Sequence, residues 1–265
     1  MKSSAKIIAV LALIALLGAC ADHKPVTKAV STSVVKPQAQ AIQNFYVPLP
    51  PPPLGQRTVE DILQTYGPYA TNKLKHYFTN AKVSYPPQAI TFVALKQEKK
   101  LELWARDSGK FKFIRNYDIQ AASGVSGPKL RQGDKQVPEG IYRIDGLNPN
   151  SHYHLSMKIN YPNEFDLFHA WQEGRTNPGS DIFIHGRAQS IGCLAMGDEA
   201  IEELFVLTAQ VNAENVKVVI APHDPRIYAL EADTNLPEWT QELYAMISRE
   251  INALSSPMNS AKIGL

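Results

Sequence analysis

The stretch AITFVALKQEKKLELWARDSGKFKF, residues 89–113, establishes the fold class. Apolar side chains alternate with others along Ile90–Ala94 and again along Leu101–Ala105, and this period of two is typical of half-buried β-strands. Asp107-Ser-Gly-Lys110 follows the second run and has the composition of a hairpin turn. The stretch therefore predicts consecutive strands joined by tight turns.

Short runs of the same type recur along the chain, with Gly and Pro between them. We expect further strands within Phe111–Ala122 and at Gly140–Ile144, His152–Ile159, Asp181–His185 and Val216–Ile220. Many short strands favour a mainly β fold, a β-sandwich or barrel, with flanking α-helices.

Helices are expected on both sides of these strands. Thr58–Asp61 has the pattern of a capping box, and Gly67-Pro68 is expected to interrupt the helix, with a second short piece at Asn72–Phe78. Asp198 would cap a further helix. Pro237–Leu254 has apolar residues at helical spacing, which predicts an amphipathic helix.

Composition and charge exclude some classes of function. The 265 residues are 44% hydrophobic and 20% charged, as in ordinary globular proteins. The net charge is only +2, and no basic cluster interleaved with aromatic residues occurs. A nucleic-acid partner is therefore not expected.

The N-terminus has the pattern of a secretory signal. Two lysines precede the apolar run Ile7–Leu17, which is too short to span a bilayer, since a span needs about 20 apolar residues. Leu17-Gly-Ala-Cys20 resembles a bacterial lipobox, which predicts acylation of Cys20; the alternative is an ordinary cleaved signal with Cys20 incidental. Ala21 at the next position favours the outer membrane over the inner, so we expect a lipid-anchored periplasmic protein.

Cys193 is the second of only two cysteines. Exported proteins usually pair their cysteines, so a lone thiol is either a reactive group or a small buried residue. His185 lies eight residues earlier, and an imidazole beside a thiol can take its proton. Gly192 permits a tight turn, and the amides of Gly192 and Cys193 are candidates for stabilising an oxyanion. The group that orients His185 is open between the carbonyl of Gly186 and the side chains of Asp181 and Asp198.

This segment resembles a known family. His185-Gly186 followed by Ser190-Ile-Gly-Cys193 is similar to the L,D-transpeptidase catalytic domain, also called the YkuD-type domain, and the resemblance continues upstream in Ser126–Ile144 and Ser151–Asn163. Ile191 stands where most members have histidine. Leu194–Met196 stand where members have an apolar residue and arginine, and the loop from His185 is about half the usual length. The chain looks like a sub-branch with this compact loop.

The resemblance implies roles for individual residues. Cys193 would be the nucleophile, His185 the general base and later the acid, and Gly192 part of the oxyanion turn. Ser190 occupies the family's Ser/Thr position three before the cysteine and belongs to the expected substrate-binding set. No cofactor or metal is expected.

Other residues are candidates for contacts with substrate. Arg187 could pair a substrate carboxylate; the alternative is a solvated loop arginine. Tyr153 and Lys129 are further candidates of this kind. His154 is expected to form a wall of the site and His152 to be a solvated strand position.

The implied function is that of a peptidoglycan L,D-transpeptidase, which forms a thioester between Cys193 and a stem peptide in cell-wall biogenesis. The expected partners are stem peptides, a wall-linked lipoprotein and the membrane. The alternatives are a cysteine amidase that gives the same thioester to water, a wall-binding lipoprotein without activity, and a zinc hydrolase. The last would use His152 and His154, two apart on one strand face, together with His169 or His185.

Five segments are expected along the chain. They are a lipoprotein signal peptide at 1–19, a flexible Pro-rich tether at 20–56, a helical N-terminal segment at 57–88, the L,D-transpeptidase catalytic domain at 89–224 and a C-terminal helical extension at 225–265.

Overall fold

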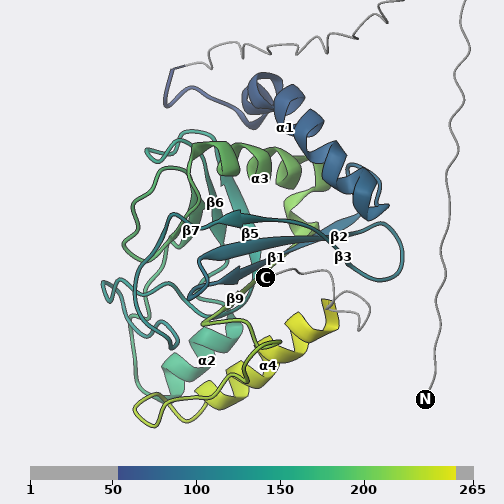
Figure 1. Cartoon of the computed structure of the whole chain (residues 1–265). Helices are drawn as coiled ribbons and strands as arrows, with labels where there is room; N and C mark the ends of the chain where they lie inside the picture. The colour runs from purple at the N-terminus through teal and green to yellow at the C-terminus, as the bar shows by residue number, and fades with distance from the viewer. Residues whose placement is uncertain (1–52, 255–265) are drawn as a thin grey trace, which may run out of the picture. The chain divides into compact units, whose positions relative to one another are not determined.

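A single sheet forms the centre of the computed structural model, which describes residues 53–254 (Figure 1). In this part of the chain it has nine strands in the order β3-β2-β1-β9-β5-β6-β7-β8-β4. The strands are β1 (Ala89–Leu95), β2 (Lys100–Arg106), β3 (Lys112–Asp118), β4 (Ala121–Ala122), β5 (Gly140–Asn148), β6 (Ser156–Ile159), β7 (Phe183–His185), β8 (Leu194–Ala195) and β9 (Val216–Ala221). The expectation of a mainly β fold with flanking helices is confirmed.

Helices cover both faces of the sheet (Figure 1). They are α1 (Val59–Ala81), α2 (Glu164–Gln172), α3 (Asp198–Val211) and α4 (Thr240–Leu254), with a 3₁₀ turn at Ala213–Asn215. α1 packs along α3 on one face, and α4 packs on β9 and β5 on the other. Within residues 53–254, no helix has both the length and the apolar character needed to cross a membrane.

The central strand β1 is buried on both faces because it lies under both helical layers. Phe92 belongs to the core beneath α1 and α3, whereas Val93 belongs to the core beneath α4. Successive side chains of a strand point to opposite faces, so each residue of β1 packs in one core or the other. The amphipathic helix predicted at the C-terminus supplies the second core with Leu243, Ile247 and Ile251.

β5 joins the two halves of the sheet. Its first part, Gly140–Arg143, pairs with β9, and its second part, Ile144–Asn148, pairs with β6. The register shifts between Ile144 and Gly146, and such a bulge bends a strand. The half beyond the bulge, β6-β7-β8-β4, carries the candidate active site.

The prediction that Gly67-Pro68 interrupts the first helix was wrong. α1 begins at the predicted capping box of Thr58 and Asp61 and then continues through Pro68 to Ala81. Gly67 is buried, and α1 packs against α3 and β3. Tertiary packing of this face outweighs the lost backbone hydrogen bond at the proline.

The strand predicted at His152–Ile159 is too long. β6 begins only at Ser156, and the residues before it form a turn in which the amide of Leu155 donates to Tyr153 O at 3.1 Å. His154 has a φ of 73°, which a strand cannot contain. His152 and His154 therefore do not share a strand face.

Two helix starts also differ from the sequence interpretation. Gly197 is the N-cap of α3, and Asp198, predicted as the cap, is its first residue. α2 was not predicted, although Asn163 and Asp166 form a complete capping box that could have indicated it. The signal, Cys20 and the tether before residue 53 lie outside the described residues.

A buried carboxylate ties α1 and α3 to β3. Glu203 of α3 is 1% exposed and contacts Lys73 Nζ at 2.7 Å, Arg115 Nη1 at 2.9 Å and the Tyr117 hydroxyl at 2.9 Å. A buried ion is stabilised only when its partners are all present. The N-terminal helix is therefore held to the sheet by charge as well as by apolar packing.

We predict that Glu203→Ala lowers the free energy of unfolding by about 3 kcal/mol, because it leaves two cations around an empty site. Urea denaturation measures this. Glu199→Ala is the matched control: Glu199 also pairs with Lys73, but its side chain is 64% exposed. It should cost less than about 1 kcal/mol. Equal losses in the two variants would contradict a special role for the buried group.

Candidate active site

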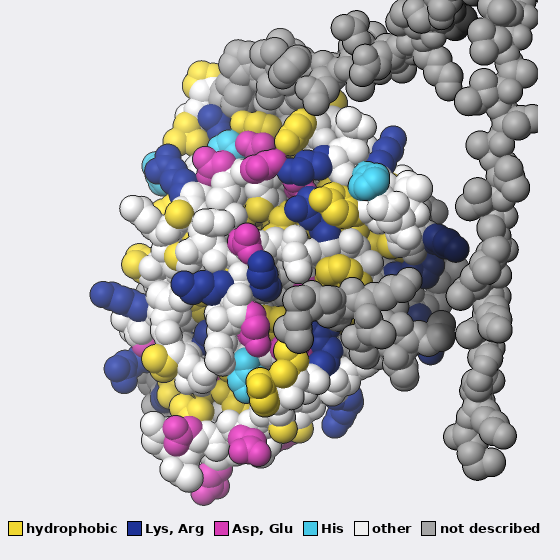
Figure 2. All heavy atoms as spheres, viewed as in Figure 1, with side chains coloured by type: hydrophobic (Ala, Val, Ile, Leu, Met, Phe, Trp, Pro, Cys, Tyr) yellow, Lys and Arg dark blue, Asp and Glu magenta, His cyan; other side chains and the backbone are white. Residues whose placement is uncertain are grey.

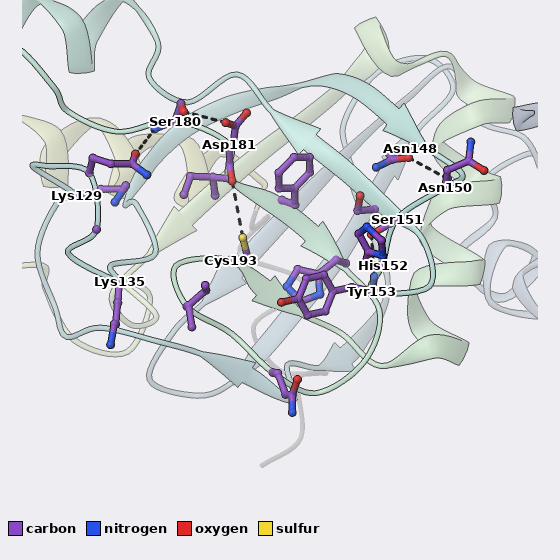
Figure 3. A pocket seen from close by; sticks show the side chains of 18 residues that line it. Lys129, Lys135, Asn148, Asn150, Ser151, His152, Tyr153, Ser180, Asp181 and Cys193 are labelled. Atoms are coloured by element: carbon purple, nitrogen blue, oxygen red, sulfur yellow. Dashed lines mark hydrogen bonds between the residues drawn. The ribbon is translucent and has the colours of Figure 1, made fainter. Parts of the chain in front are cut away.

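Cys193 and His185 line one pocket of about 480 Å³ (Figure 3). Their meeting follows from strand pairing: β7 ends at His185, and β8 begins directly after Cys193. The two strands are parallel neighbours, with Ile184 opposite Leu194. The loop between them turns back through left-handed backbone at Arg187 (φ 56°) and Gly192 (φ 125°). The predicted turn at Gly192 thus uses a conformation that favours glycine.

A backbone carbonyl orients His185. Its Nδ1 lies 2.6 Å from Gly186 O. A carbonyl oxygen can only accept, so Nδ1 carries the proton and Nε2 of the neutral ring has a free lone pair. Of the three candidate orienting groups, the structure selects Gly186. The carboxylate of Asp181 contacts Lys158, and that of Asp198 accepts from the Arg187 amide.

Burial keeps both reactive groups neutral in the free protein. It lowers the pKa of His185 below its ordinary value and raises the pKa of the Cys193 thiol above its own. The thiol lies 4.0 Å from the carbonyl oxygen of Asp181 (Figure 3). Because desolvation disfavours both charged forms, the resting site holds a thiol and an imidazole rather than an ion pair. The thiolate must then form by proton transfer during the reaction.

Ser190 organises the loop that carries Cys193. Its hydroxyl donates to Cys193 O at 2.6 Å and accepts from the amides of Ser123, Gly192 and Cys193 at 3.2–3.3 Å. The structure thus gives this residue, predicted to bind substrate, contacts within the loop itself.

The amides proposed for an oxyanion therefore do not point freely into the pocket. The Gly192 and Cys193 amides share the Ser190 oxygen with the Ser123 amide, and a hydroxyl oxygen has only two lone pairs. All three bonds are longer than the usual 2.9–3.0 Å or so. The oxyanion role of Gly192 stays a prediction, and it requires these amides to exchange Ser190 for the substrate oxygen.

Only some of the remaining predicted site residues line the pocket. Tyr153 lines the pocket, and its ring lies 4.6 Å from that of His185. His152, expected to be solvated, also lines the pocket, whereas His154, expected to form its wall, does not. Instead, His154 Nε2 lies 2.7 Å from Glu202, because the left-handed backbone at this residue turns its ring away. Arg187 is exposed and is not among the lining residues.

Several lining residues were not predicted. One group, Gln132, Gly133 and Lys135, comes from the loop before β5. The other, Asn148, Asn150 and Ser151, comes from the end of β5 and the turn after it (Figure 3). Both segments lie far from Cys193 in sequence, so no local pattern could reveal them. The available signals were the family-like segments Ser126–Ile144 and Ser151–Asn163, which contain Gly133, Lys135 and Ser151.

The histidines required by the zinc alternative are not brought together. His154 pairs with Glu202, and His169 stacks on Trp239 with ring centroids 4.5 Å apart. Within residues 53–254, no group of three or more potential ligands is placed to hold a metal ion. The zinc-hydrolase interpretation therefore has no site in the described part of the chain.

Ser190→Ala should lower the rate of Cys193 acylation by about tenfold or more, because it releases several hydrogen bonds each worth about 1 kcal/mol. Ser190→Thr keeps the hydroxyl and is the matched control. Single-turnover acylation, followed by mass spectrometry of the intact protein, measures the effect. An alanine variant as fast as the parent would show that the hydroxyl does not organise the loop.

We predict that the pH dependence of Cys193 alkylation and of acyl transfer reflects a thiol and an imidazole that are both neutral in the resting site. Alkylation of Cys193 by iodoacetamide should rise only through an apparent pKa above about 8.5, since burial raises the pKa of this thiol. Acyl transfer should fall with decreasing pH only below about 6.5, because burial lowers the pKa of His185. Alkylation is read by mass spectrometry with His185→Gln beside the parent. A plateau of alkylation between pH 6 and 8 that disappears in His185→Gln would instead indicate an ion pair.

Comparisons with known proteins agree on one family. The model of the L,D-transpeptidase catalytic domain family (YkuD) matches residues 88–220. The "Putative L,D-transpeptidase YafK" of Escherichia coli K12 is 37% identical over 112 residues, which is 42% of this chain and 43% of that protein. The match thus spans less than half of the relative's length.

Solved structures give partial likenesses. Bd1075 of Bdellovibrio bacteriovorus has a TM-score of 0.37 and 20% identity, over 62% of this chain and 56% of that chain. The helical cell shape determining protein Pgp2 from Campylobacter jejuni has a TM-score of 0.42 and 16% identity, over 63% of this chain and 70% of that chain.

Proposed function

Because this chain belongs to the L,D-transpeptidase catalytic domain family, we propose that it is a peptidoglycan L,D-transpeptidase that acts through a thioester on Cys193. One observation carries the proposal: Cys193 shares a pocket with a histidine whose Nδ1 is held by a carbonyl and whose Nε2 is free to accept a proton. Both residues fall within the matched segment. That arrangement suits a nucleophile activated by a general base.

In the proposed first step, His185 Nε2 takes the thiol proton while Cys193 Sγ attacks a carbonyl of the donor stem peptide. The carbonyl belongs to a diamino-acid residue and follows its L-configured centre. The C–N bond to the terminal D-alanine then breaks, and His185 gives its proton to the leaving amine. The product is a thioester on Cys193, and the base is neutral again.

In the second step, an amine of another stem or of a wall-linked lipoprotein attacks the thioester. His185 removes the proton of the amine and returns it to sulfur as the C–S bond breaks. The neutral resting pair suits both steps, because the same imidazole must accept and donate within each.

A hydrolase that uses the same thioester is the second candidate. Ile191 is 74% exposed at the rim of the pocket, and it stands where most family members have a histidine. The rim therefore lacks one polar side chain that would contact an acceptor, while water can still enter. The two candidates differ only in the second step.

We further propose that the catalytic part is tethered to a membrane in the periplasm through an acylated Cys20. The lipobox-like sequence and the Pro-rich segment after it support this proposal. Such a tether would keep the domain close to the peptidoglycan.

The chain without its signal (residues 20–265) should convert purified peptidoglycan fragments to dimers joined between diamino-acid residues. Mass spectrometry of the fragments is the measurement, and Cys193→Ala, which should form none, is the control. Shortened stems or released lipoprotein fragments without dimers would favour the hydrolase. No change with either protein would refute thiol catalysis and favour a wall-binding lipoprotein.

A further inference from the structure

The pocket carries one unneutralised cation among the described residues. Its charged lining residues are Lys129, Lys135 and Asp181. The buried Lys129 pairs with Asp134, and Asp181 contacts Lys158 Nζ at 2.8 Å. Lys135 is exposed, and no carboxylate of residues 53–254 pairs with it. A positive charge is therefore available for a ligand.

The loop that bears Lys135 is held rigidly. The carboxylate of Asp134 accepts from the amides of Leu130, Arg131 and Gln136 at 3.0–3.1 Å, and also from Lys129. Its hydrogen bonds fix the backbone on both sides of Lys135. The backbone position from which the Lys135 side chain extends is thus fixed by these hydrogen bonds.

Lys135 itself has an unfavourable backbone conformation. Its φ is 56°, in the left-handed region, and its carbonyl accepts from the Ser123 hydroxyl at 2.7 Å. A side-chain-bearing residue rarely occupies this region unless its surroundings impose it, and such residues cluster at functional sites. The same Ser123 contributes its amide to Ser190, so one residue links the cation to the nucleophile loop.

The backbone of Lys135 lies close to the backbone that precedes the nucleophile, and both residues line the same pocket. A Cβ placed on Gly192 would lie only 3.8 Å from the carbonyl carbon of Lys135, and Gly192 precedes Cys193 directly. Figure 3 shows Lys129 and Lys135 on one side of Cys193, with His152 and Tyr153 on the other. A substrate attacked at Cys193 would extend toward the cation at one end of the pocket.

We propose that Lys135 binds a carboxylate of the donor stem peptide and thereby selects donors that carry this charge. The inference rests on the proposed function, in which a stem peptide is the donor. Two carboxylates lie near the attacked carbonyl: the terminal one of D-alanine and the one on the side chain of the diamino acid. Consecutive Cα atoms are about 3.8 Å apart, so the terminal group is one residue from the attacked bond and within reach of a lysine. Arg187, predicted for such a contact, is not among the lining residues.

Binding to the full chain carrying Cys193→Ala tests the proposal without turnover. The probes are the tetrapeptide stem, the same peptide with a C-terminal carboxamide, and one with the diamino-acid side-chain carboxylate amidated. Calorimetry should show affinity about tenfold lower for one amidated peptide, since a hydrogen bond to a charged group is lost. The peptide that binds weakly identifies the carboxylate.

In the Cys193→Ala background, Lys135→Gln should weaken binding of the unmodified peptide about tenfold, as amidation of the peptide does, and all three peptides should then bind equally. Lys135→Arg should restore tight binding of the unmodified peptide. Lys99→Gln is the matched control, because Lys99 is also exposed, also has a left-handed φ (51°), and its carbonyl also accepts, from the Ile119 amide. The proposal is overturned if Lys135→Gln binds the unmodified peptide like its parent, or if all three peptides bind equally.

Turnover of the parent chain separates this inference from the proposed function. Charge-dependent binding without cleavage of the stem would support the Lys135 subsite and refute the catalytic step. Cleavage of acid and amide peptides at equal rates would support the catalytic step and overturn the Lys135 subsite.

Discussion

The parallel pairing of β7 with β8 is the constraint on which the site depends. It fixes the end of one strand at His185 and the start of the next just after Cys193, so the loop between them must close over a short distance. The loop does so with left-handed backbone at two positions and with one serine hydroxyl at its centre. The placement of His185 and Cys193 thus depends on strand pairing in the half of the sheet that lies beyond the register shift in β5.

The chemistry of the pair follows from burial in the same sheet. His185 is 3% exposed, and its Nδ1 contacts the carbonyl of the next residue. Among residues 53–254 no carboxylate pairs with this ring, so burial lowers its pKa and disfavours the imidazolium. A neutral pair remains unreactive toward most electrophiles, because the thiolate is the nucleophilic form of cysteine.

Local patterns in the sequence predicted much of the fold, because strand periodicity and the Thr58–Asp61 capping box act within a few residues. Prediction failed where tertiary contacts decide the outcome. α1 passes through Pro68 because its face packs on α3, and no local rule contains that contact. The turn at His154 also depends on its environment, and so a strand pattern was extended too far.

The candidate site likewise contains residues that a local sequence segment revealed and residues that only the folded structure brings together. His185, Ser190, Gly192 and Cys193 lie within one short segment, and their residue types together with the resemblance to the L,D-transpeptidase domain predicted thiol chemistry. Lys135 comes from a distant loop, and its significance appears only when the charges around the pocket are paired off.

The Ser190 hydrogen bonds have a consequence for how such a site can diversify. The hydroxyl holds the loop from inside, while Arg187, Ala188, Gln189 and Ile191 are exposed, and Gln189 and Ile191 line the pocket. None of these four is needed to keep the thiol in place. The exposed residues of the loop can therefore vary while the serine and the glycine behind the thiol stay fixed, and under the proposed function such variation would change which acceptor binds. Within the same eleven-residue segment, 183–193, the residues that hold the thiol in place thus differ from the residues that are exposed to a substrate.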